Sequence, residues 1–168
     1  MITIKMNTLC RLSVVFLLVC GSSLGSDPAY RPLWLYKGTW RATRKTQNGD
    51  STTSTLTDDC AMAGRFFACQ QTINGKPGAL IIFVPSGQPG HYYTQAVLQE
   101  GFATGRGELQ IEGERWTYSS KSDQNGRTLY HRTINVFSGK NRIHFEQSES
   151  SDGQNWTTTA SGDNVRIK

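Results

Sequence analysis

The stretch Leu33-Trp34-Leu35-Tyr36-Lys37-Gly38-Thr39-Trp40 decides how the rest of the chain is interpreted. It begins as a short apolar segment, and Gly38-Thr39-Trp40 then opens a run of strand-like sequence. After Trp40, turn signals recur at short intervals, and pairs such as Asn74-Gly75 and Asn125-Gly126 are strong hairpin signals because glycine adopts positive φ without strain. The runs between these turns are rich in Thr, Val, Ile, Tyr, Phe and Trp, which favour strands. We therefore predict an all-β fold that begins at this tryptophan.

About ten consecutive strands are expected, and no apolar helical period of three turns occurs after Gly38. The expected strands are 39–47, 52–60, 65–73, 78–84, 91–98, 102–111, 114–121, 127–137, 141–149 and 155–167. A break in the sixth strand at Gly105 or Gly107, and in the last at Gly162, is the alternative. A meander of this length must protect its edges, and closure into a barrel does so completely. The predicted fold is a single up-and-down antiparallel β-barrel with a short N-terminal segment. A sandwich is the alternative, but it would normally need a long crossover connection, and none is visible.

Residues 1–25 are expected to be a secretory signal peptide. Lys5 and Arg11 precede an apolar run at 12–20, which is shorter than the roughly 20 residues that span a bilayer, and small residues follow it. An uncleaved anchor and a lipid anchor on Cys20 are the alternatives, although Val19 is bulkier than the residue that a lipoprotein signal needs before its cysteine.

Cleavage after Gly25 or Ser26 would leave residues 26–168 as one barrel domain, secreted or periplasmic. The formal charge of the full chain is +5 at pH 7, and removal of Lys5 and Arg11 lowers it by two. Because the remaining basic residues are scattered singly, no nucleic-acid partner is predicted.

Two of the four cysteines, Cys60 and Cys69, lie beyond the signal peptide. Two cysteines that are the only ones in a chain usually form a disulfide in an oxidising compartment. A four-residue loop or a tight Gly64-Arg65 turn would place the two cysteines opposite each other, whereas an Ala63-Gly64 turn would place Cys60 opposite Phe67. We predict a structural disulfide rather than a redox site.

Three elements in this order carry a family resemblance: Gly38-Thr39-Trp40, Gly64-Arg65-Phe66-Phe67, and the segment from Ser150 through Asp152-Gly153 to Trp156. Together they resemble the calycin superfamily of lipocalins and fatty-acid-binding proteins, and more closely a group of small bacterial secreted lipocalin-like proteins of unassigned function. The resemblance covers most of residues 33–168. It implies that Trp40 plugs the closed end of the barrel and that Arg166, from the last strand, packs across its ring.

The resemblance also includes nitrobindins, heme-binding barrels that carry iron on a histidine near the C-terminus. This chain has no histidine after His144, so no cofactor is expected. His131 and His144 lie on neighbouring expected strands, but a zinc site usually needs three or four ligands, and Glu146 and Glu149 do not converge on them by spacing. No metal site is predicted.

Several strands mix polar and aromatic residues on the face expected to point inward, which predicts a partly polar barrel interior. The candidate ligand-binding residues are Phe67, Tyr93, Gln95, Trp116, Tyr118, Tyr130 and Arg132. Tyr130 and Arg132 share one strand face, and the resemblance implies that such a pair can hold a ligand carboxylate. The alternative is a set of ordinary core aromatics, with Arg132 paired to an interior acid.

The predicted function is non-catalytic binding of a small hydrophobic or amphipathic molecule. A structural or protein-interacting barrel with a filled interior is one alternative, and a calycin-type isomerase or cyclase is another. An enzyme would need a titratable pair converging inside, such as His131 or His144 against Glu146 or Glu149, and no nucleophile motif or Ser/His/Asp spacing is visible. A cavity of several hundred Å³, open opposite Trp40, distinguishes the binding hypothesis from the filled barrel.

Overall fold

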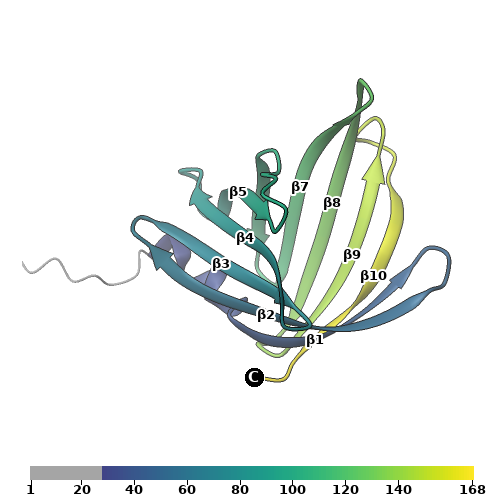
Figure 1. The fold of residues 1–168 in the computed structure, drawn as a ribbon. Helices are drawn as coiled ribbons and strands as arrows, with labels where there is room; N and C mark the ends of the chain where they lie inside the picture. The colour runs from purple at the N-terminus through teal and green to yellow at the C-terminus, as the bar shows by residue number, and fades with distance from the viewer. Residues whose placement is uncertain (1–27) are drawn as a thin grey trace, which may run out of the picture.

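The computed structural model describes residues 28–168, in which two short 3-10 helices lead into ten strands (Figure 1). The helices are η1 (Pro28–Tyr30) and η2 (Pro32–Leu35). The strands are β1 (Gly38–Thr46), β2 (Ser51–Ala63), β3 (Phe66–Ile73), β4 (Lys76–Pro85), β5 (His91–Leu98), β6 (Gly107–Glu112), β7 (Arg115–Gln124), β8 (Arg127–Ser138), β9 (Arg142–Ser150) and β10 (Thr157–Arg166). The predicted signal peptide lies outside the described residues. Among the described residues, no helix is long and apolar enough to cross a membrane.

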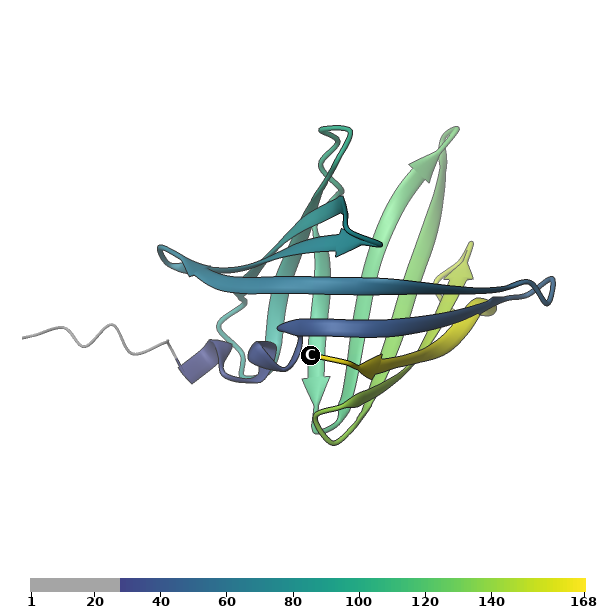
Figure 2. The same ribbon diagram turned by 60° about the horizontal axis from the view of Figure 1, so that its bottom comes forward.

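The ten strands form one closed antiparallel barrel in which each strand pairs with its neighbours in sequence (Figure 2). The barrel closes where β1 pairs with β10, in a register that sets Trp40 opposite Arg166. This confirms the predicted up-and-down barrel and excludes the sandwich. The prediction was wrong at the start of the sixth strand, because residues 99–106 form a loop and β6 begins only at Gly107.

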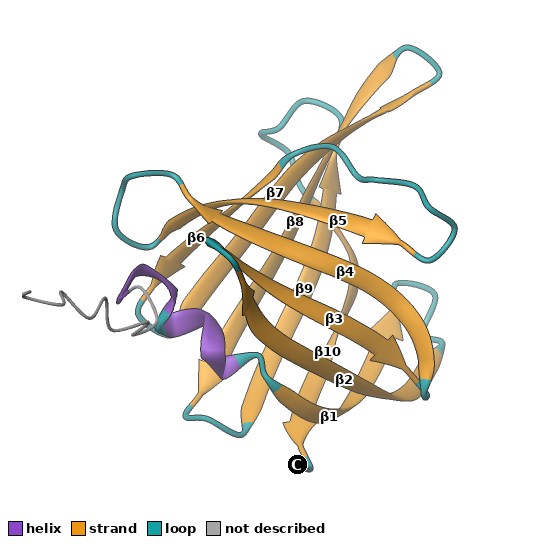
Figure 3. Ribbon diagram, turned by 60° about the vertical axis from the view of Figure 1, so that its left-hand side comes forward, coloured by secondary structure: helices purple, strands orange, loops and turns teal. Residues whose placement is uncertain are grey.

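The hydrophobic core gathers at the end of the barrel that η1 and η2 cover (Figure 3). Buried apolar side chains at this end come from the helices and from most of the strands: Tyr30, Leu33, Trp40, Phe67, Phe83, Tyr92, Leu109, Trp116, Phe137 and Ile143. Tyr36 lies just after η2. The centre of its ring is 4.9 Å from the centre of the Trp116 ring and 5.9 Å from that of the Phe137 ring. The apolar residues that precede Gly38 therefore form the lid of the closed end.

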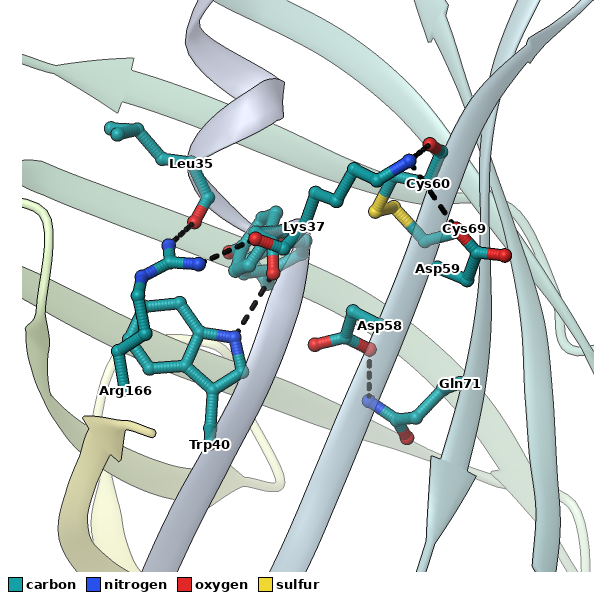
Figure 4. Close-up of a disulfide and its surroundings, with 11 residues drawn as sticks. Leu35, Lys37, Trp40, Asp58, Asp59, Cys60, Cys69, Gln71 and Arg166 are labelled. Atoms are coloured by element: carbon teal, nitrogen blue, oxygen red, sulfur yellow. Dashed lines mark hydrogen bonds and ion pairs between the residues drawn. A yellow bond between two sulfur atoms is a disulfide. The ribbon is translucent and has the colours of Figure 1, made fainter. Parts of the chain in front are cut away.

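Cys60 and Cys69 are bonded to each other across β2 and β3 (Figure 4). Ala63 pairs with Phe66, so the connection is the tight Gly64-Arg65 turn, and Gly64 takes a positive φ of 63°. The predicted disulfide is therefore present. Of the two connections expected to place the cysteines opposite each other, the tight Gly64-Arg65 turn is the one found. Both cysteines are buried on the inner face of the barrel wall.

Candidate functional site

The closed end is sealed by Trp40 and Arg166 (Figure 4). The guanidinium carbon of Arg166 lies 4.0 Å from the centre of the Trp40 ring, as the family resemblance implied. Arg166 also donates hydrogen bonds to the backbone carbonyls of Leu35, Lys37 and Lys140, at 2.6, 2.5 and 2.9 Å. One side chain thus ties the N-terminal segment, the β8–β9 turn and the plug together.

Gly38 is needed where it stands because Arg166 occupies the space that a side chain would take. Its φ is +144°, and a Cβ added there would lie 2.2 Å from Nη1 of Arg166. Arg166 therefore packs against both residues of the motif, over the ring of Trp40 and in the space beside Gly38.

A cavity of about 370 Å³ lies on the inner side of this plug. Its apolar walls come from Trp40, Leu56, Cys69, Ile81, Phe83 and Ile143. Its polar lining comes from Tyr36, Asp58, Gln71, Tyr118, Thr133, Asn135, Gln147 and Asn164. We call this space the inner cavity. Mostly apolar walls with a few polar groups are typical of small-molecule sites.

Two tyrosines and an amide form a hydrogen-bonded group in the inner cavity. Tyr118 donates from its hydroxyl to the Tyr36 hydroxyl at 2.5 Å, and Asn135 Nδ2 donates to the same oxygen at 3.1 Å. Burial raises the pKa of both tyrosines well above the usual value, so both phenols stay neutral. The Tyr36 oxygen therefore accepts two hydrogen bonds, and its own proton can still be donated to a third partner.

Asp58 is the charged residue of the inner cavity. Its side chain lies across from Gln71, whose Nε2 donates to Oδ1 at 3.1 Å (Figure 4). Burial raises the pKa of Asp58 from 3.8 to about 6, and the hydrogen bond from Gln71 offsets only part of that rise. Among the described residues that line this cavity there is no Lys, Arg or His, so no cation compensates the carboxylate.

Asn164 adds a second acceptor to the same cavity. Its Oδ1 is buried and has no hydrogen-bond partner within the part of the chain that the structure describes. A buried acceptor without a partner costs free energy, on the order of 1–3 kcal/mol. Asp58 and Asn164 therefore both favour an occupant that donates hydrogen bonds.

A second cavity, of about 450 Å³, adjoins the first toward the other end of the barrel. The two share Ile81, Tyr118 and Thr133 in their linings. We call this space the mouth cavity. It is rich in hydroxyl side chains, which come from Thr94, Thr104, Ser119, Ser120, Ser122 and Thr133. The barrel interior is therefore hollow beyond Trp40.

The seven predicted ligand-binding residues fall into three groups: residues of the core, residues that line a cavity, and residues on the outer face. Phe67 and Trp116 are fully buried in the core at the closed end. Tyr118 is the one member of the seven that lines the inner cavity, and it lines the mouth cavity as well. Gln95 lies at the edge of the mouth cavity with an exposed side chain, and its Nε2 donates to the carbonyl of Thr104 at 3.0 Å.

The other three, Tyr93, Tyr130 and Arg132, lie on the outer face of the barrel. Side chains alternate along a strand, and Asn135 and Phe137 point inward. Tyr130 and Arg132 do share a face, as predicted, but it is the outer one.

Each of these outer side chains has its own partner outside the barrel. Arg132 lies 4.1 Å from the centre of the Trp156 ring. Tyr93 neighbours the buried Tyr92 on β5, and it carries Arg106 over its ring at 4.5 Å. The expected carboxylate-binding pair is therefore absent from the interior.

The two histidines of β8 and β9 lie on opposite faces. His131 points inward beside Glu149, with 3.4 Å between Nδ1 and Oε1, whereas His144 points outward to Asp163. The described residues hold no group of three or more His, Cys, Asp or Glu that could bind a metal ion.

Sequence reasoning missed Asp58 and Asn164 as site residues. The signal for Asp58 was present, because it lies two residues before Cys60 and must share its face. Asn164 carried the same kind of signal, because it lies two residues before Arg166, which was expected to pack over Trp40.

Fold and site together define a closed barrel with a hollow, partly polar interior. No protein-family model and no curated protein matches the chain. Among solved structures, the chain is similar to Rv2717c from M. tuberculosis, with a TM-score of 0.51 and 13% identity over 84% of this chain and 99% of that one.

Two further similar structures are barrels bound to DFHBI. EF1p2_mFAP2b has a TM-score of 0.39 and 11% identity, over 82% of this chain and 98% of that one. The redesigned β-barrel mFAP1 has a TM-score of 0.37 and 13% identity, over 79% of this chain and 95% of that one. At these identities, what the comparisons establish for this chain is the barrel fold of Rv2717c.

Proposed function

We propose that this protein is a secreted or periplasmic, lipocalin-like barrel that binds a small amphipathic molecule in the inner cavity. The observation that carries the proposal is the cavity itself, whose lining combines apolar side chains with polar groups from several strands. A barrel with a filled interior would leave no such space. The disulfide supports an oxidising compartment, because disulfides persist there.

The polar groups favour a ligand that carries an amine or another hydrogen-bond donor on an apolar body. Asp58 and the unpaired Oδ1 of Asn164 are both acceptors, and no cationic side chain lines the inner cavity among the described residues. A protonated amine near Asp58 would offset the free-energy cost of burying its carboxylate. This replaces the carboxylate ligand expected from Tyr130 and Arg132, since both lie outside the barrel.

The test compares decylamine with decanoate at pH 7.5 by isothermal titration calorimetry. Both have the same alkyl length but opposite charge. We expect saturable binding of decylamine and at least about tenfold weaker binding of decanoate, which corresponds to about 1.4 kcal/mol. Asp58→Asn should remove most of this preference. Asp59→Asn is the matched control, because Asp59 is the exposed neighbour that pairs with Lys37 at 3.4 Å.

Tighter binding of decanoate would contradict the donor preference, and no binding of either probe would count against the inner cavity as a site for simple amphiphiles. Native mass spectrometry of protein purified from its own host tests binding without choosing a probe. A retained mass supports the proposed function, and a bare chain across several growth conditions counts against it.

A further inference from the structure

Three polar side chains meet on the inner face of the barrel at the mouth cavity: Ser122 on β7, His131 on β8 and Glu149 on β9. The Ser122 Oγ lies 2.8 Å from His131 Nε2, and His131 Nδ1 lies 3.4 Å from Glu149 Oε1. His131 and Glu149 are direct cross-strand partners, whereas Ser122 is diagonal to His131. The barrel register therefore brings together a serine, a histidine and a carboxylate from three successive strands.

The order of contacts sets the role of each group. A carboxylate can only accept, so the 3.4 Å contact between Nδ1 and Glu149 favours the tautomer in which Nδ1 carries the proton. This leaves the lone pair of Nε2 to accept from the Ser122 hydroxyl. A nucleophile within hydrogen-bond reach of a base, which a third group in turn orients, is the arrangement that activates serine for acyl transfer.

Ser122 and His131 both line the mouth cavity of about 450 Å³, so a small substrate can reach them from the space inside the barrel. Thr94, Ser120 and Thr133 line the same cavity with hydroxyl groups. These are the candidate donors for the oxyanion that forms when a hydroxyl attacks a carbonyl. Nucleophile, base and donors thus surround one accessible volume.

We propose that Ser122, His131 and Glu149 hydrolyse small neutral carboxylic esters in the mouth cavity. Ser122 Oγ attacks the ester carbonyl carbon, and its proton passes to His131 Nε2. When the tetrahedral intermediate collapses, the alcohol leaves with that proton and the acyl group remains on Ser122. Water then gives a proton to Nε2 and attacks the acyl group, and the carboxylic acid leaves as Ser122 Oγ takes the proton back. Ester and water thus give acid and alcohol.

Ser122 and His131 are the catalytic residues of this scheme, and Glu149 is a positioning residue that holds the imidazole. The scheme revises the expectation of a non-catalytic barrel. It does not rest on ligand binding in the inner cavity, because Ser122 and His131 open onto the mouth cavity.

The first test is covalent labelling of the full barrel domain with a fluorophosphonate, followed by intact mass and peptide mapping. We expect one adduct, on Ser122, and none in Ser122→Ala. His131→Gln should slow labelling by about 100-fold or more, in line with the usual contribution of a general base. Ser138→Ala is the matched serine control, because Ser138 is exposed at the end of β8 and lines neither cavity.

The second test is turnover of p-nitrophenyl butyrate. Surface imidazoles also react with activated esters, so His144→Gln, on the outer face, is the control for that background. We expect Ser122→Ala to lose the turnover that exceeds the background and His144→Gln to keep it. Glu149→Gln should lower kcat at unchanged KM, and Glu149→Asp should restore part of it, which a merely structural loss would not do.

Unfolding midpoints measured for every variant separate lost chemistry from lost folding. An adduct on another residue, or equal turnover in the wild-type protein and a folded Ser122→Ala variant, would overturn the proposal. Because decylamine binding is measured separately, failure here leaves the proposed ligand site standing, and the reverse also holds.

Discussion

The guanidinium carbon of Arg166 lies 4.0 Å from the centre of the Trp40 indole ring at the closed end of the barrel. The two residues are also direct partners in the β1–β10 register that closes the barrel. Closure of the sheet and sealing of its end therefore depend on the same pair. A cation over an indole contributes about 0.5–2 kcal/mol, and the carbonyls that Arg166 satisfies add to this.

Arg166→Ala should lower the free energy of unfolding by about 2–4 kcal/mol, because it removes the stacked cation and leaves three backbone carbonyls without their donor. Urea denaturation measures this. Arg41→Ala is the control, since Arg41 is exposed beside Trp40 and should change stability by less than about 0.5 kcal/mol. Equal effects of the two variants would show that Arg166 does not anchor the closed end.

Gly38→Ala should be more destabilising than Gly49→Ala. Both glycines have positive φ, so both substitutions strain the backbone, but only at Gly38 would the new Cβ collide with Arg166, whereas nothing lies within 4 Å of the one at Gly49. Backbone strain costs on the order of 1–3 kcal/mol at either position, and the collision adds to it at Gly38. Thermal unfolding of the two variants makes the comparison, and similar midpoints would contradict it.

The fold was predictable because its signals are local. Turn residues such as Asn74-Gly75 mark the hairpins. The runs between the turns are short and rich in strand-forming residues, so they do not favour a helix. The sixth strand was predicted to begin at residue 102, but residues 102–106 belong to a loop with one isolated bridge between Val97 and Ala103. The edge of that loop is set by tertiary contacts, which local sequence does not report.

The site was not predictable, because it depends on which strand face points inward. On β8, Tyr130 and Arg132 on one face look as suitable as His131 and Asn135 on the other. The inward face is the one that carries Asn135, whose side chain donates a hydrogen bond to Tyr36 in the distant N-terminal segment. Likewise, Ser122 belongs to no nucleophile motif, and its contact with His131 follows from the register of β7 and β8.

Asp58 should make the protein lose stability as the pH rises from about 4 to about 6. The ordinary pKa of an aspartate is 3.8, and that of Asp58 in the folded protein is about 6. Between pH 4 and pH 6 the folded state therefore holds the proton more strongly than the unfolded state. Below pH 4 Asp58 is protonated in both states, so no charge is buried. Above pH 6 the folded state buries a carboxylate, and this lowers the free energy of unfolding by about 2–3 kcal/mol. Ionisation therefore destabilises the fold.

Asp58→Asn should remove that loss, because asparagine keeps an oxygen for Gln71 and carries no charge. Denaturation at pH 4, 5, 6 and 7 should show wild type and variant diverging as pH rises, with the variant more stable at pH 7. Asp59→Asn should run parallel to the wild-type protein. A constant difference between Asp58→Asn and wild type across the series would contradict the assignment.

The Cys60–Cys69 disulfide closes a short loop, and the chain-entropy model gives it about 2.5–3 kcal/mol of stability. Dithiothreitol should therefore lower the urea midpoint of the wild-type protein by a corresponding amount. The double variant Cys60→Ala, Cys69→Ala should unfold at the lower midpoint whether or not the reductant is present. A wild-type midpoint that reductant does not move, once free-thiol titration has shown the bond to be broken, would mean that the bond adds no stability.

Arg132→Ala separates the two views of where a ligand binds. Arg132 lies outside the barrel over Trp156, so its removal should leave decylamine affinity within about twofold of wild type, which is less than about 0.5 kcal/mol. Asn164→Leu is the matched change inside, because it replaces the buried acceptor with an apolar group of similar size. We expect it to weaken decylamine binding by several-fold while raising the free energy of unfolding, since the unpaired Oδ1 no longer has to be buried. If Arg132→Ala weakened binding and Asn164→Leu did not, the ligand would lie against the outer wall, and the inner cavity would be only packing space.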